Sequence, residues 1–241
     1  MDLYAFEKGI RRMIFRQLFD HESSTYTYLV GDEKSKEAVL IDPVREHIGR
    51  DSKLVEELGL KLIYALETHI HADHITGGGE LRLRTGCKTA VGNLAKVQCA
   101  DIYLNDGDEL KLGSLSLRAL ATPGHTNSCT SYSMPGFVFT GDCLLIRGCG
   151  RTDFQEGSSE KLFHSVREKL FKLPDETIVY PAHDYKGIAC TSILEEKKFN
   201  PRLNLDLDFN AFKKIMSELK LPPPKQIEKA VPANLNCGQA G

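Results

Sequence analysis

Short runs rich in apolar and β-branched residues alternate with amphipathic runs along the first part of the chain. This pattern predicts strands over residues 13–19, 26–31, 38–42 and 61–67, with an amphipathic helix over 51–58. A short helix over 80–84 and a further strand over 88–91 follow. The first part of the chain is therefore expected to form a sheet with helices laid against it.

The second part of the chain repeats this alternation. We expect a hairpin over 110–112 and 115–120, strands over 137–140 and 177–180, and helices over 159–172, 192–199 and 209–219. Three prolines at 222–224 end the last helix, and the residues beyond them are expected to be a tail packed on the surface. The pattern favours one domain over residues 1–241, with a C-terminal helical segment and tail from about residue 188.

A dense polar cluster directly follows the strand expected at 61–67. His69, His71 and His74 place three imidazoles beside the carboxylate of Asp73. Imidazole nitrogens and carboxylate oxygens are ligands for divalent metals, and the end of a buried strand can aim them at one point. A metal site is therefore the first hypothesis for this segment.

Three later strand ends carry further candidate ligands. His125, Asp142 and His183 each follow an apolar strand. Loops at one end of β-rich sandwiches converge, so residues far apart in the sequence can share a site. Isolated histidines are more often satisfied polar residues, but their repetition at strand ends favours one metal centre.

Composition narrows the class of protein. The chain has 241 residues and a net charge of -2, so its overall charge does not call for a polyanion or an anionic membrane. Its seven cysteines are scattered without a C-x-x-C pair, which argues against a disulfide framework and favours a reducing compartment. Because the N-terminus carries Asp2 and Glu7 and no long apolar segment, we expect a soluble cytoplasmic protein.

The ligand pattern resembles the metallo-β-lactamase superfamily. Its signature T-H-x-H-x-D-H is matched by residues 68–74, and its later histidine, aspartate and final histidine fall at His125, Asp142 and His183. The resemblance covers roughly residues 13–200. It implies an α+β fold, an αββα sandwich of two mixed sheets flanked by helices, with the metal at the edge between the sheets.

A narrower resemblance to the persulfide dioxygenases extends over nearly the whole chain. It is carried by residues 141–154, 180–185, 200–203 and 231–234, and the discriminating motif is Arg-Gly-Cys-Gly-Arg-Thr-Asp-Phe at 147–154. Members of this family bind one iron ion and oxidise glutathione persulfide with dioxygen and water to sulfite and glutathione. The resemblance implies the same reaction here, with O2 and a low-molecular-weight persulfide as substrates.

The resemblance assigns one Fe(II) to His69, His125 and Asp142, which makes these the catalytic centre. In this assignment four neighbours of the site do not bind the iron: His71, Asp73, His74 and His183. Two imidazoles and one carboxylate on one face of an octahedron leave three positions open, which suits non-haem iron enzymes. The same seven side chains could instead hold two zinc ions, as in thioester hydrolases of the glyoxalase II type.

Four residues outside the metal centre resemble or accompany positions that contact the substrate. Each also has a structural interpretation: Cys149 as a small buried residue, Arg151 as the partner of Asp153, Tyr185 as a core phenol, and Arg202 as a helix cap near Asn200. The sequence alone leaves both interpretations open. A homodimer and a sulfurtransferase of the same pathway are possible partners, whereas a nuclease role lacks a basic stripe.

Overall fold

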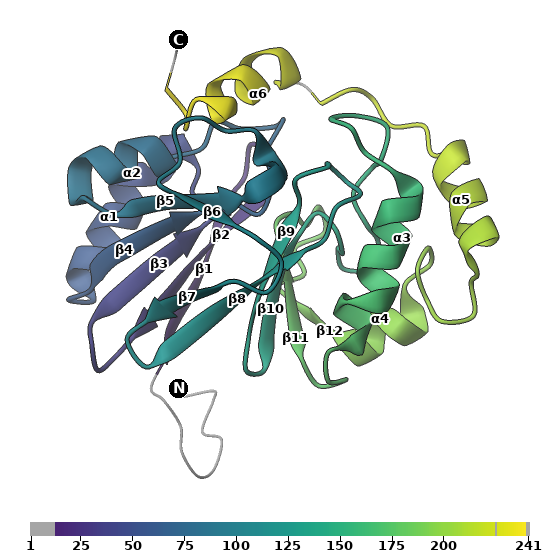
Figure 1. The fold of residues 1–241 in the computed structure, drawn as a ribbon, viewed down its shortest axis with the longest axis horizontal. Helices are drawn as coiled ribbons and strands as arrows, with labels where there is room; N and C mark the ends of the chain where they lie inside the picture. Colours follow the sequence, from purple (N-terminus) through teal and green to yellow (C-terminus); the bar gives the residue numbers. More distant parts are fainter. Residues whose placement is uncertain (1–12, 225, 240–241) are drawn as a thin grey trace.

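The computed structural model describes residues 13–224 and 226–239. Asp2 and Glu7, which entered the prediction of cellular location, lie outside these described residues. The described chain builds two six-stranded sheets, ordered β1-β2-β3-β4-β5-β6 and β12-β11-β10-β9-β8-β7. Figure 1 shows α1 and α2 on the outer side of the first sheet and α3, α4 and α5 on the outer side of the second.

The first sheet comes from the N-terminal part of the chain. Its strands are β1 (Met13–Asp20), β2 (Thr25–Asp32), β3 (Glu37–Ile41), β4 (Lys61–Leu66), β5 (Lys88–Gly92) and β6 (Ile102–Leu104). The first two pairings are antiparallel, and the β3–β4, β4–β5 and β5–β6 pairings are parallel. The parallel crossovers carry α1 (Ile48–Glu57) and α2 (Gly78–Thr85), close to the two helices that the pattern predicts.

The second sheet follows the same logic with more antiparallel pairs. It contains β7 (Glu109–Leu112), β8 (Leu115–Ala121), β9 (Thr130–Met134), β10 (Phe137–Gly141), β11 (Ile178–Pro181) and the short β12 (Thr191–Ser192). Between β10 and β11 the chain forms α3 (Ser159–Glu168), and α4 (Ile193–Phe199) and α5 (Phe209–Glu218) follow β12. Both sheets are mixed, so the expected αββα sandwich is confirmed.

Alternation along the strands explains the layers. Tyr28 and Phe139 face the core between the sheets, while their neighbours Leu29 and Val138 pack under the helices on the two outer sides. Since successive side chains of a strand point to opposite faces, a central strand covered on both faces is mostly apolar along its length. Most of the strands can therefore be predicted from apolar runs in the sequence.

Several features differ from the sequence-based expectations, and the short strands β6 and β12 are among them because the pattern predicts neither. The polar run Thr130–Met134 is the buried strand β9, and the residues expected to form a surface tail contain the helix α6 (Ile227–Leu235) with Pro232 inside it. A disulfide joins Cys99 to Cys237, although the scattered cysteines predicted none. Each is set by contacts between distant segments, which local patterning does not record.

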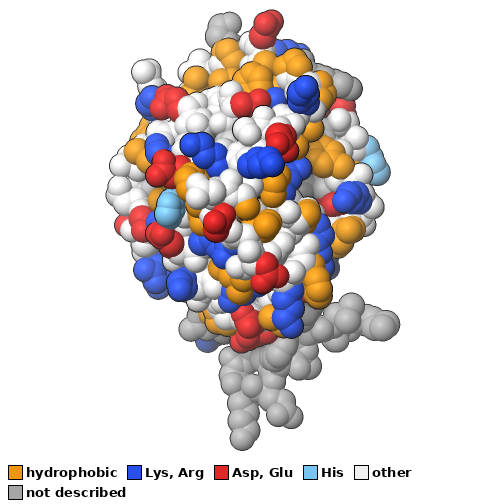
Figure 2. Space-filling model, turned by 90° about the vertical axis from the view of Figure 1, so that its right-hand side faces the viewer, with side chains coloured by type: hydrophobic (Ala, Val, Ile, Leu, Met, Phe, Trp, Pro, Cys, Tyr) orange, Lys and Arg blue, Asp and Glu red, His pale blue; other side chains and the backbone are white. Residues whose placement is uncertain are grey.

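The surface gives little indication of a charged partner on the face that Figure 2 shows. Lys, Arg, Asp and Glu side chains are interspersed there with apolar ones, and no stripe of one sign gathers. No helix in the described ranges is both long and apolar enough to cross a bilayer.

Candidate metal centre at the edge between the sheets

Four strands deliver the candidate ligands to one edge of the sandwich. β8 and β10 both pair antiparallel with β9, and β11 pairs parallel with β10, so these three strands end at the same side. The residues that follow them include His125, Asp142 and His183. At this edge Tyr26 N donates to Ala182 O at 2.7 Å, which ties β2 to the second sheet. Thr130 N donates to Thr68 O at 2.8 Å, which ties the loop after β4 to the same sheet.

The first group of candidate ligands is His69, His125 and Asp142. One nitrogen of each imidazole and one carboxylate oxygen all lie within 4.8 Å of one another, and His125 Nε2 is 3.6 Å from Asp142 Oδ2. His125 Nδ1 must donate to the carbonyl oxygen of Arg151 at 2.7 Å, because a carbonyl only accepts. This bond leaves the Nε2 lone pair free to bind a metal.

The protonation states of His69 and Asp142 suit the same role. Burial, aided by the positive charge of His71, holds the pKa of His69 well below its usual value and keeps the imidazole neutral. Burial raises the pKa of Asp142, but the charge and hydrogen bond of His183 outweigh it and hold that pKa well below the usual range. A neutral imidazole and an ionised carboxylate are the forms that bind a metal.

His183 joins the first group to a second one. Its Nδ1 donates to Asp142 Oδ1 at 2.6 Å and its Nε2 to Asp73 Oδ2 at 3.0 Å. Although burial lowers the pKa of His183, these two carboxylates raise it well above the usual value. His183 therefore acts as a cationic bridge between two carboxylates and turns Asp142 Oδ2 toward His125.

The second group contains His71, Asp73, His74 and His183, whose ligand atoms also lie within 4.8 Å of one another. Both ring nitrogens of His71 and Nε2 of His74 are buried without a hydrogen bond. His71 Nε2 is nevertheless 3.2 Å from Asp42 Oδ1, and this charge raises the pKa of His71 to about 10 although burial lowers it. Burial lowers the pKa of His74, and its buried Nε2 has no hydrogen bond, which is costly unless the atom binds something. The donor set therefore fits a metal centre at this edge.

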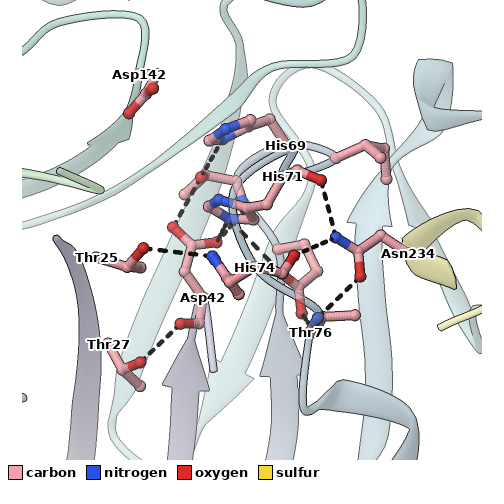
Figure 3. A network of polar contacts seen from close by, with 12 residues as sticks. Thr25, Thr27, Asp42, His69, His71, His74, Thr76, Asp142 and Asn234 are labelled. Atoms are coloured by element: carbon pink, nitrogen blue, oxygen red, sulfur yellow. Dashed lines mark hydrogen bonds and ion pairs between the residues drawn. The ribbon is translucent and has the colours of Figure 1, made fainter. Parts of the chain in front are cut away.

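Asp42, which directly follows β3, supports the cluster, and so does Glu67, whose Oε2 lies 3.9 Å from His71 Nε2. The sequence did not reveal this role. Asp42 accepts from Thr68 N at 2.7 Å and from Thr68 Oγ1 at 2.8 Å. It adopts a left-handed backbone conformation with φ 52°, which aspartate tolerates better than most residues. The only local signal was an Asp-Pro pair directly after an apolar strand. Figure 3 shows this network around Asp42 and the histidines.

The four candidate substrate contacts lie in different surroundings. Tyr185 is 73% exposed, so it is not a core phenol, and its ring lies nearly parallel to that of His183 with centroids 6.2 Å apart. Arg151 forms the expected bidentate pair with Asp153, with N–O distances of 2.7 and 2.8 Å. It also donates to the carbonyl of Pro222 at 2.6 Å. The Arg151 guanidinium therefore braces the loop over 147–154.

Cys149 and Arg202 belong to the same support. The thiol of Cys149 is buried and lies 3.8 Å from the sulfur of Met216, which favours its interpretation as a small core residue. Burial raises the pKa of Cys149 to about 11, so the thiol stays protonated. Arg202 Nη1 donates to Cys149 O at 3.0 Å, whereas the helix α4 is followed by Asn200 as its cap. Arg202 thus holds the loop rather than capping the helix.

Comparisons with known proteins place this site in context. Residues 22–183 match the metallo-beta-lactamase superfamily. The persulfide dioxygenase ETHE1 of Bos taurus, named as mitochondrial, is 52% identical over 229 residues, which cover 94% of this chain and 89% of that protein. The crystal structure of ETHE1 from Myxococcus xanthus superimposes with a TM-score of 0.92 at 53% identity, covering 94% of this chain and 100% of that one.

A hydrolytic relative is more distant. The hydroxyacylglutathione hydrolase of Methylococcus capsulatus is 37% identical over 164 residues, covering 66% of this chain and 62% of that protein. The similarity to persulfide dioxygenases is higher and extends over more of the chain. The comparisons therefore do not favour a glyoxalase II activity.

We expect Asp142→Ala to lose most of its bound metal. The substitution removes one ligand atom from the first group and leaves the cationic His183 bridge without one of its two carboxylates. Loss of a ligand should lower metal affinity by more than the roughly 10- to 100-fold that is typical of removing a supporting residue. Elemental analysis of the purified variant measures this. Asp153→Ala, whose carboxylate is exposed and pairs with Arg151, is the matched control. Full metal content in Asp142→Ala would exclude Asp142 as a ligand.

Proposed function

The chain belongs to the metallo-beta-lactamase superfamily and, within it, to the persulfide dioxygenases, and on this basis we propose that it oxidises glutathione persulfide with O2 at one Fe(II) ion. The products would be sulfite and glutathione. The observation that carries the proposal is the convergence of His69, His125 and Asp142 in a chain whose similarity to persulfide dioxygenases spans almost its whole length.

His69, His125 and Asp142 would hold the iron. When bound, Fe(II) would offer open positions at which sulfur and O2 can meet, and a redox change that Zn2+ lacks. His125 is oriented by its bond to Arg151 O, and Asp142 is oriented by its bond to His183. Both supports come from the chain itself.

The residues of the second group would serve as supports rather than as ligands. The carboxylate of Asp73 is already engaged by His183 Nε2 and by His74 Nδ1, both at 3.0 Å. Thr25 Oγ1 lies 3.0 Å from His183 Nε2 and completes this arrangement. Such mutual pairing favours one ion at the first group over two ions shared by both groups.

Of the proposed substrate contacts, Tyr185 is best placed to touch glutathione directly. Its exposed ring lies parallel to His183, with an interplanar angle of 3°, and offers a flat apolar wall beside the centre. Arg151, Arg202 and Cys149 would act through the loop over 147–154, which they brace. We therefore propose that Tyr185 contributes to substrate affinity and that the other three shape the pocket.

The metal and the reaction can be tested together. We expect protein purified without added metal to contain one iron per chain and to consume O2 with glutathione persulfide. A redox-active ion can relay electrons from the persulfide sulfur to oxygen, whereas Zn2+ cannot. Elemental analysis and an oxygen electrode measure both quantities. The zinc-loaded protein should consume no O2, and hydrolysis of S-lactoylglutathione by that form tests the thioester hydrolase alternative. Two zinc ions in the fully active enzyme would contradict the proposal.

A second test concerns the substrate contact. Tyr185→Ala should raise KM for glutathione persulfide by a factor of about 2 to 12 with little change in kcat, because a ring contact contributes roughly 0.5–1.5 kcal/mol. Steady-state kinetics measures the effect. Tyr185→Phe retains the ring and is the matched control, so its KM should stay near that of the parent. An unchanged KM in Tyr185→Ala would remove this residue from the substrate site.

Location and partners complete the proposal. We propose a cytoplasmic enzyme on the basis of its sequence, although the Bos taurus relative is named as mitochondrial. Subcellular fractionation distinguishes the two locations.

We also propose that the protein forms a homodimer, which sedimentation would detect. A sulfurtransferase is proposed as the source of the persulfide, and an assay that couples the two enzymes would detect this. Nucleic acid and membrane are not part of the proposed function.

A further inference from the structure

The C-terminal helix α6 contacts the loop that carries the first candidate ligands. We call residues 67–76 the ligand loop and residues 227–238 the C-terminal clamp. Asn234 of the clamp is 4% exposed. Its Nδ2 donates to the carbonyl oxygens of His71 and His74, both at 2.9 Å, and its Oδ1 accepts from Thr76 N at 2.8 Å. Figure 3 shows this amide facing three backbone groups of the ligand loop.

In these three bonds both the donor and the acceptor of the Asn234 amide bind the backbone of the ligand loop. Both hydrogens of Nδ2 are donated, and the carbonyl groups they reach belong to residues whose side chains form the candidate metal centre. The backbone direction at His71 and His74 fixes where their rings point. Asn234 therefore controls the cluster from the side opposite to Asp42.

The end of the clamp packs against the same region. Gly79 N donates to Cys237 O at 3.1 Å, and Arg45 Nη1 donates to Gly238 O at 3.1 Å. A Cβ added at Gly238 would lie 2.1 Å from Thr76 O, so the two backbones are in direct contact. The clamp has little freedom while these contacts persist.

A covalent bond fastens the clamp to the rest of the fold. The disulfide Cys99–Cys237 joins positions 138 residues apart. Ile70, Val91 and Val97 pack with Cys237 in one small apolar cluster, and Val231 of α6 packs against it. Cys237 has φ 55°, a left-handed conformation that favours glycine, so a cysteine there carries a backbone cost. The cross-link gives a reason for a cysteine at this position.

We propose that Asn234 is a positioning residue for the ligand loop and that the Cys99–Cys237 disulfide locks the C-terminal clamp in place, so that thiols release it. In the locked state α6 presents Asn234 to the loop. In the released state only non-covalent contacts retain the helix, and the supports of His71 and His74 loosen.

The release is an ordinary thiol–disulfide exchange with a low-molecular-weight thiol. Cys99 is half-buried and Cys237 is buried, so Cys99 Sγ is the accessible sulfur. A thiolate attacks Cys99 Sγ, forms a mixed disulfide and displaces the Cys237 thiolate. A second thiolate then attacks the mixed disulfide, releases the Cys99 thiolate and leaves as the small-molecule disulfide. Two thiols are oxidised, two protein thiols form, and the protons of the two small thiols are transferred to them.

The connection to activity rests on the proposed function, because the thiol product of persulfide oxidation is itself a reductant of this class. The clamp can nevertheless be tested without any turnover. Amide hydrogen exchange of the full chain reports the protection of the ligand loop and of α6 directly. Failure of the dioxygenase assay and failure of the clamp would therefore be seen in different measurements.

The test compares the oxidised protein with protein reduced by dithiothreitol or by glutathione, after counting free thiols in each. We expect the amides of residues 67–76 and 227–238 to exchange several-fold faster after reduction, while those of β10 and β11 stay unchanged. Chelator-driven release of metal should become faster by roughly 10- to 100-fold, because the proposed ligand His69 lies in the same loop and loses the support of its neighbours. Unchanged exchange in the ligand loop of fully reduced protein would overturn the proposal. Failure of both air and oxidised glutathione to form the Cys99–Cys237 disulfide would also overturn it.

Variants separate the lock from the positioning residue. Cys99→Ser should show the fast exchange with or without thiol, whereas Cys190→Ser, which removes a free cysteine, should respond to thiol as the parent does. In Asn234→Ala the amides of the ligand loop should exchange faster. Those of α6 should keep their protection, since the disulfide remains. Asn234→Asp keeps the acceptor for Thr76 N but loses both donors, so it should behave as Asn234→Ala. If Asn234→Asp retained full protection of the loop, the positioning role of the amide donors would be wrong.

Discussion

The bridge that His183 makes between Asp142 and Asp73 is the interaction on which the rest of the site depends. Asp142 and His183 follow strands of the second sheet, whereas Asp73 lies in the loop that leaves the first. The imidazole therefore joins the two halves of the sandwich at the edge where their ligands meet. Removing one partner of a buried pair of this kind typically costs about 3–5 kcal/mol, because the other charge is left without compensation.

The bridge is possible because of how the strands run. β8, β10 and β11 end on the same side, and backbone hydrogen bonds at that side tie residues 26 and 68 to the second sheet. Apolar side chains from both sheets fill the space below, with Tyr28, Tyr132 and Phe139 among the largest fully buried ones. This core keeps water away from the polar cluster, and the low polarity there strengthens each ion pair within it.

The supports of the site form two opposing layers around the ligand loop. Asp42 accepts hydrogen bonds from Thr68 at the start of the loop, and Asn234 binds the backbone at its far end. The first support directly follows β3 of the first sheet. The second comes from a helix that is joined to the fold by a disulfide and a small apolar cluster. Reduction of the disulfide would therefore affect the support from Asn234 and not the support from Asp42.

The sequence by itself determined most of the strands, most of the helices and the metal-binding character of the site. Most of the buried strands are apolar runs, and three histidines with an aspartate in one short segment indicate a metal site. The convergence of His69, His125 and Asp142 was expected because each follows a strand. Only the tertiary structure decided the roles of Thr25, Asp42, Asn234 and the Cys99–Cys237 pair. These residues act through partners far away in the chain, and no local period or spacing encodes such a contact. For the same reason β9 and α6 escaped prediction, since their stability comes from burial against other elements rather than from their own pattern.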